Sequence, residues 1–213
     1  MGGRGASSGG SGFTGGNSTL NPADIVSTSS LISERGVKRQ EVDEVLQTFK
    51  DVKDEYGYII NDIQLATLKG GGMDTLAYYD GSNIAINQSF FDKAIMERAY
   101  ARSVQEGFHP SQGNRTALQA VASHELGHAL TDAVGSKMGV IKGDTATAIL
   151  KEAKGQTKFK GSLGDMAGKI SGYAKYNPRE TIAEAFADVY CNGNKSTRES
   201  QAIVNVMNKY LKK

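Results

Sequence analysis

The sequence predicts an α+β fold that is mainly helical, with a small antiparallel or mixed sheet beside one central helix. Three observations support this prediction. Apolar residues recur at helical spacing over most of the chain, and strand-like patterns with hairpin signals are confined to about residues 58–87. The most apolar helical segment also contains two of the three histidines. With 213 residues, the chain is long enough for one domain with a sizeable core.

The N-terminal segment differs in composition from the rest of the chain. Residues 1–19 contain eight glycines and four serines, so they bury too little apolar surface to offset the entropy lost on ordering. We therefore expect a disordered Gly/Ser-rich tail over residues 1–30 and a folded domain over residues 31–213. The tail is either a leader without function or a tether.

The expected elements follow in order along the folded domain. An amphipathic helix begins near Val37 and ends at Gly57, because its apolar residues lie three or four positions apart. Extended segments follow, with a turn at Gly70–Gly72 and a hairpin signal at Asp80–Gly81 before the returning strand Asn83–Asn87. Further helices are expected over about residues 90–105, 115–134, 144–154, 178–191 and 197–211.

Composition excludes several classes of function. Lys and Arg total 25 against 23 Asp and Glu, and a net charge of +2 gives no electrostatic reason to expect nucleic-acid binding. No apolar stretch is long enough to predict a transmembrane helix, and the N-terminus lacks the apolar run of a secretory signal. The single cysteine, Cys191, excludes an intramolecular disulfide and is expected to be a buried structural thiol.

The motif HELGH at residues 124–128 predicts a metal site. Positions i and i+4 of a helix share one face, so the imidazoles of His124 and His128 can bind one metal ion. Zinc suits two nitrogen ligands plus a carboxylate, and Glu125 is placed to act as a general base. The surrounding helix is apolar nearly all round, so it is expected to be central, where buried polar side chains are costly unless a metal compensates.

A third protein ligand is expected from a second helix. Glu180, Glu184 and Asp188 are spaced i, i+4 and i+8, which predicts an acidic stripe with small alanines between its members. Such a stripe is often a solvated face. Its neighbours are apolar or small, however, and no basic residue follows at i+4, so we expect the stripe to face the histidine helix. His109 lies upstream in a Gly/Pro loop and is expected to be an ordinary surface histidine.

Two segments resemble those of a known family. HExxH followed by a glutamate on a second helix is the pattern of gluzincin metallopeptidases. Within that group, residues 173–186 (YAKYNPRETIAEAF) resemble the zinc-site segment of the anthrax lethal factor catalytic domain and related Pro-Pro endopeptidases. The resemblance implies a zincin-like fold, a zinc cofactor and peptide hydrolysis. The chain departs from the family at Thr181-Ile182, where an aromatic residue is usual, and in the Gly/Lys-rich stretch 135–172.

The resemblance also implies roles for individual residues. Glu180 is implied as the third zinc ligand, and Glu184 as the acid that orients the first motif histidine. Tyr173, seven residues before Glu180, is implied as the donor that stabilises the developing oxyanion, with Tyr176 as its rival. Asp132, four residues after the second motif histidine, is either a partner of that histidine or a charge near the helix end.

These residues together predict a zinc endopeptidase that acts on a protein or peptide substrate. Glu125 would take a proton from the attacking water and pass it to the leaving amine. The predicted strand Asn83–Asn87 is a candidate sheet edge beside the zinc helix, where an extended peptide could pair with the backbone.

Two other interpretations stay open at this point. The start MGGRGASSGG resembles the N-termini of proteins encoded among phage head-morphogenesis genes. This suggests a virion-associated or head-morphogenesis protein with a structural zinc site. The second interpretation is a toxin protease domain delivered by another polypeptide. In the absence of a secretory signal, the expected location is the cytoplasm of a bacterial host or the virion.

Overall fold

A computed structural model of the chain describes residues 28–29, 38–57, 60–66, 75–140 and 143–212. Its helices are α2 (Arg39–Tyr56), α3 (Lys93–Gln105), α4 (Ala117–Met138), α5 (Thr145–Thr157), α6 (Leu163–Ala167), α7 (Pro178–Asn192) and α8 (Arg198–Leu211). Its strands are β1 (Thr28–Ser29), β2 (Asp62–Ala66), β3 (Ala77–Tyr79) and β4 (Asn83–Asn87). The predicted mainly helical α+β class is confirmed.

The helices match the predicted segments closely, with one addition. Helices α2, α3, α4, α5, α7 and α8 lie where apolar periodicity predicts them. The short helix α6 was not predicted, because it lies in the Gly/Lys-rich stretch; a capping box between Ser162 and Asp165 supports its first turn. Strand β1 falls inside the predicted tail, while residues 1–27 and the predicted turn at Gly70–Gly72 lie outside the described residues.

The sheet is mixed, in the order β1-β2-β4-β3. Strands β1 and β2 pair in parallel, as do β2 and β4, whereas β3 and β4 are antiparallel. The expectation that Asn83–Asn87 forms the sheet edge is wrong. This strand is β4, and it pairs on both sides, with Ile84 and Ile86 fully buried. The edge strands of the described sheet are β1 and β3, and of these two β3 contacts α4.

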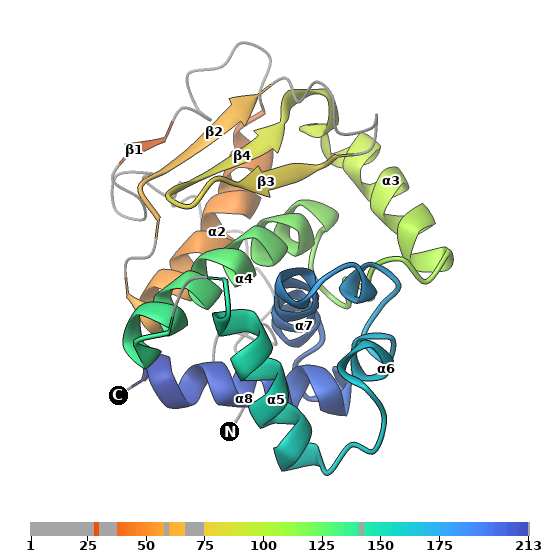
Figure 1. Cartoon of the computed structure of the whole chain (residues 1–213). Helices are drawn as coiled ribbons and strands as arrows, with labels where there is room; N and C mark the ends of the chain where they lie inside the picture. The colour runs from red at the N-terminus through yellow and green to blue at the C-terminus, as the bar shows by residue number, and fades with distance from the viewer. Residues whose placement is uncertain (1–27, 30–37, 58–59, 67–74, 141–142, 213) are drawn as a thin grey trace.

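Helix α4 is the centre of the structure. Figure 1 shows it between the sheet above and helices α5 to α8 below. Its N-terminus is fixed by a capping box between Thr116 and Gln119. Leu118, Leu126 and Leu130 are at most 1% exposed, in agreement with the predicted apolar character all round the helix. Because the first part of α4 is buried on nearly every side, the polar residues there have fixed positions.

Helix α7 approaches α4 very closely. A Cβ atom added at Gly127 would lie 2.8 Å from the Cα of Ala183 and 3.2 Å from the Cβ of Phe186. The glycine inside the HExxH motif therefore allows the backbones of the two helices to pack together. Small residues at such a crossing place the side chains on either side of it within reach of one another.

This close contact predicts a specific stability effect. Gly127→Ala is expected to destabilise the fold by about 1–3 kcal/mol, because the new methyl group overlaps backbone atoms of α7 that cannot move aside. The measurement is urea unfolding in the presence of a chelator, so that metal binding does not contribute to stability. The matched control is Gly155→Ala in α5, where an added Cβ meets no atom within 4 Å. That change is expected to stabilise by up to about 1 kcal/mol through helix propensity. Equal effects of the two substitutions would contradict the proposed backbone contact.

Candidate metal centre

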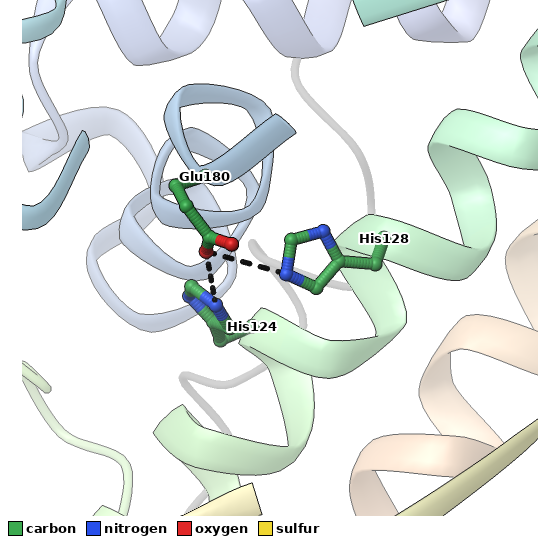
Figure 2. Close-up of side chains that lie close together, drawn as sticks. All are labelled: His124, His128 and Glu180. Carbon is green, nitrogen blue, oxygen red and sulfur yellow. Dashed lines mark hydrogen bonds and ion pairs between the residues drawn. The ribbon is translucent and has the colours of Figure 1, made fainter. Parts of the chain in front are cut away.

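Two histidines of α4 and one glutamate of α7 converge on a single point. The Nε2 atom of His124 lies 3.1 Å from Oε2 of Glu180, and Nε2 of His128 lies 3.3 Å from the same oxygen. Figure 2 shows both imidazoles directed at this carboxylate across the interface of the two helices. The side chains of His124, His128 and Glu180 are 13%, 11% and 15% exposed, respectively. The structure thus contains a buried His/His/Glu group that could hold a metal ion.

The spacing of these atoms fits a tetrahedral ion. Metal–ligand bonds of about 2.0–2.2 Å place neighbouring ligand atoms roughly 3.3–3.6 Å apart. The candidate ligand atoms all lie within 4.8 Å of one another, so small side-chain shifts would complete the geometry. His124 provides a second indication of a cation site, since both of its ring nitrogens face carboxylate oxygens. A neutral imidazole has one N–H group, so this arrangement needs either a second proton or a cation at Nε2.

The start of α7 positions Glu180. Asn177 caps the helix, and its side-chain oxygen accepts hydrogen bonds from the backbone N–H groups of Arg179, at 2.9 Å, and Glu180, at 3.0 Å. Pro178 occupies the first turn, where its missing N–H costs nothing. Glu180 therefore lies in the first helical turn, where the helix dipole favours a negative charge.

Glu184, one turn further along α7, is a buried acceptor for three side chains. Its Oε1 atom accepts from Nδ1 of His124, at 2.7 Å, and from Nδ1 of His109, at 3.0 Å. Its Oε2 atom accepts from Oγ of Ser171, at 2.7 Å. The Nδ1–H bond of His124 leaves the Nε2 lone pair of its neutral ring free to bind a cation.

Two residues around Glu184 were not found from the sequence. The expectation that His109 is an ordinary surface histidine is wrong, because its side chain is 16% exposed and bonds to the buried carboxylate. The one sequence signal for a role of His109 is that the chain has only three histidines and the other two form the HELGH motif. Ser171 gave no signal, because it lies in a loop and meets Glu184 only through folding.

Burial and pairing shift the ionisation of these groups in opposite directions. Burial alone would lower the pKa of His124, but hydrogen bonds to Glu180 and Glu184 outweigh it and raise that pKa. Burial alone would raise the pKa of Glu180, but its hydrogen bonds with the two motif histidines hold it well below the usual range. In the metal-free centre, His124 is thus paired with two carboxylates, and a cation at its Nε2 atom can replace the proton there.

Glu125 faces a cavity beside the metal centre. The side chain is buried, and desolvation raises its pKa, opposed by the nearby motif histidines. The cavity has a volume of about 250 Å³ and extends to the edge-strand region at Thr75–Ala77. Its other lining residues are Tyr100, Phe108, His109, Val121, His124, Tyr173 and Glu184. A carboxylate with a raised pKa on a cavity wall is a typical general base.

Tyr173 and Tyr176 have different surroundings. Tyr173 lines the cavity, and its ring lies 5.8 Å from that of His124, centroid to centroid. Burial and the nearby carboxylate of Glu180 raise its pKa to about 12, so its hydroxyl stays protonated near neutral pH. Tyr176 is 78% exposed. The geometry therefore places Tyr173, rather than Tyr176, beside the metal centre.

The remaining candidate residues make contacts outside the His124/His128/Glu180 group. Asp132 accepts a hydrogen bond from Nη1 of Arg179 at 2.7 Å, which joins α4 to α7. The Nδ1 atom of His128 has no hydrogen-bond partner among the described residues, so Asp132 does not form a hydrogen bond with it. Asp188 accepts from the backbone N–H of Thr197 at 2.9 Å, at the start of α8, so the acidic stripe extends to the metal centre only through its first two members. Cys191 is buried as expected, and burial raises its pKa to about 12.

Comparison with known proteins gives no indication of function, so any functional proposal rests on the residues of the candidate site. The chain matches no protein-family model, no curated protein and no solved structure. Within the described residues, no helix is both long and apolar enough to cross a membrane.

The buried carboxylate of Glu184 predicts an acid-dependent contribution to stability. Burial favours its neutral form, but hydrogen bonds from His109 and His124 prevail and lower its pKa to about 2, from 4.5. This carboxylate therefore stabilises the fold fully above about pH 4.5, and the contribution is lost as the pH falls towards 2.

The substitution Glu184→Gln tests this contribution in metal-free protein. The variant is expected to lose roughly 3 kcal/mol or more near neutral pH, because the buried imidazoles lose their charged partner. The difference from the wild-type protein should shrink as the pH falls from 4.5 towards 2. The free energy of unfolding, measured at a series of pH values, checks this. A difference that is constant with pH would contradict the assigned ionisation.

Proposed function

We propose that the protein is a zinc-dependent endopeptidase. The observation that carries the proposal is the convergence of His124, His128 and Glu180 on one point, with the buried Glu125 on the wall of the adjoining cavity. Catalytic zinc sites use three protein ligands and leave one position open. A His/His/Glu set with a neighbouring glutamate is one of the combinations that support hydrolysis by an activated water.

The protein residues would divide the chemistry as follows. His124, His128 and Glu180 hold the ion, which when bound supplies Lewis acidity that polarises a carbonyl and lowers the pKa of water. Glu125 accepts the proton of the attacking water and then donates it to the leaving amine. Its raised pKa brings its basicity closer to neutral pH, where both transfers are efficient. The protonated hydroxyl of Tyr173 donates a hydrogen bond to the developing oxyanion.

The edge strand supports a peptide as the substrate class. Asn87 N–H donates to the carbonyl of Leu76, and Asp80 N–H donates to the carbonyl of Asn83. Because antiparallel pairing alternates, the backbone groups of Ala77 and Tyr79 point away from β4, towards the side where the described residues form no further strand. An extended peptide can pair with these groups and place one side chain in the cavity between Ala77 and Val121.

The sequence resemblance supports the same class of enzyme. The segment at residues 173–186 supplies Tyr173, Glu180 and Glu184 in the order seen in the lethal factor and Pro-Pro endopeptidase group. The three side chains gather around His124 as that resemblance implies. We therefore propose that the chain is a divergent gluzincin with a different substrate cleft.

Glu125→Gln tests the catalytic assignment. The variant is expected to retain one zinc ion per chain, because Glu125 is not among the proposed ligands. It should lower peptide cleavage by about 10²–10⁴-fold, through loss of the general base. Metal content after reconstitution and cleavage of a diverse peptide library give the two readouts. Cleavage that survives in this variant would disprove the role of Glu125. Wild-type protein that binds zinc but cleaves no peptide would instead indicate a structural metal site.

The two tyrosines provide a second, matched test. Tyr173→Phe is expected to lower kcat by about 10²–10³-fold with little change in KM, because the hydroxyl is used only in the transition state. Tyr176→Phe, at an exposed position three residues away, serves as the control and should change neither constant. Steady-state kinetics on the best library peptide separate the two constants. The reverse pattern would assign the oxyanion donor to Tyr176.

A further inference from the structure

We propose that His109 is a positioning residue that acts through Glu184 to fix the orientation of His124. The inference rests on the proposed metal site, and it concerns a residue outside both of the motifs that define that site. His109 lies in the loop between α3 and α4, fifteen positions before His124. Folding brings its Nδ1 atom to the same carboxylate oxygen of Glu184 that accepts from Nδ1 of His124.

The carboxylate of Glu184 is fixed by three donors. His124 and His109 share one of its oxygens, and Ser171 donates to the other. The glutamate side chain is 1% exposed, so no bulk water competes for these bonds. If His109 is removed, the shared oxygen keeps one donor, and the carboxylate can rotate away from His124. The orientation of the His124 ring therefore depends on His109 through this oxygen.

His109 is itself held rigidly. Its ring stacks on that of Tyr100, with centroids 5.5 Å apart and planes 8° from parallel. The hydroxyl of Tyr100 donates to the carbonyl of Pro110 at 3.1 Å, which ties the loop to α3. A hydrogen-bond donor orients its acceptor only when its own position is fixed, and this stack provides that fixation.

The same loop also holds the segment that carries Tyr173. Gly172 N–H donates to the carbonyl of Gly107 at 2.8 Å, and Tyr173 N–H donates to the carbonyl of Phe108 at 2.9 Å. The ring of His109 meets that of Tyr173 edge to face at 5.3 Å. The ring of His109 thus lies next to both the ring of a proposed zinc ligand and the ring of the proposed oxyanion donor.

The experiment compares two substitutions that separate the hydrogen bond from the ring. His109→Phe keeps an aromatic ring to stack on Tyr100 but removes the donor to Glu184. His109→Asn removes the ring but can present an amide N–H near the position of Nδ1. The primary readout is the zinc dissociation constant, measured by competition with a chromogenic chelator. The second is the visible spectrum of the cobalt-substituted protein, which reports ligand geometry.

Outer hydrogen-bond partners of ligating histidines typically contribute 10–100-fold to metal affinity, so His109→Phe is expected to weaken zinc binding by about tenfold or more. It should also alter the cobalt spectrum. His109→Asn should restore affinity to within about threefold of the wild-type value, because the donor is present again. A purely structural role for His109 would give the opposite order, since the phenylalanine variant preserves packing better than the asparagine variant.

The outcomes separate this inference from the proposed function. Wild-type affinity in His109→Phe, or an equal loss in both variants, overturns the positioning role of His109. Unfolding of the metal-free variants in urea identifies any loss that is due to stability alone. Wild-type protein that binds zinc without cleaving peptides would overturn the proposed activity, while the affinity series would still decide the role of His109. Wild-type protein that binds no zinc overturns both.

Discussion

The close packing of α4 against α7 is the contact on which the rest of the structure depends. Gly127 has no side chain at the crossing, and Ala183 fills little space on the other helix. Because the backbones approach so closely, side chains one turn away on each helix reach across the interface. The distance between His124 and Glu180 is a direct consequence of this crossing. Packing and chemistry thus depend on the same few residues.

A second constraint arises from the burial of so many ionisable groups at this crossing. Unpaired charges in such a place would be very costly, so each must have a partner. Glu184 receives three hydrogen bonds, and Glu180 faces two imidazoles. Without metal, the raised pKa of His124 keeps a proton on its ring between the two carboxylates, and a cation at Nε2 would replace that proton.

The cavity joins this charged centre to the sheet. Helix α4 contacts both β3 and α7, so its N-terminal half presents Glu125 between the edge strand and the metal centre. Tyr173 reaches the same space from the segment before α7. The loop around His109 then ties this segment to α3. The cavity wall is therefore formed by the β3 region, α3, the loop before α4, α4 itself, and the segment that runs into α7, although a recognisable motif is present only in α4 and in this last segment.

Local spacing in the sequence determined the helices, the shared face of His124 and His128, and the stripe that contains Glu180 and Glu184. Helical periodicity relates residues three or four positions apart, so these features needed no tertiary information. Tertiary structure alone decided that β3 rather than β4 lies at an edge of the sheet, and that His109 and Ser171 bond to Glu184. Strand order and contacts between loops depend on which distant segments pack together, and no local pattern of residue types encodes that choice.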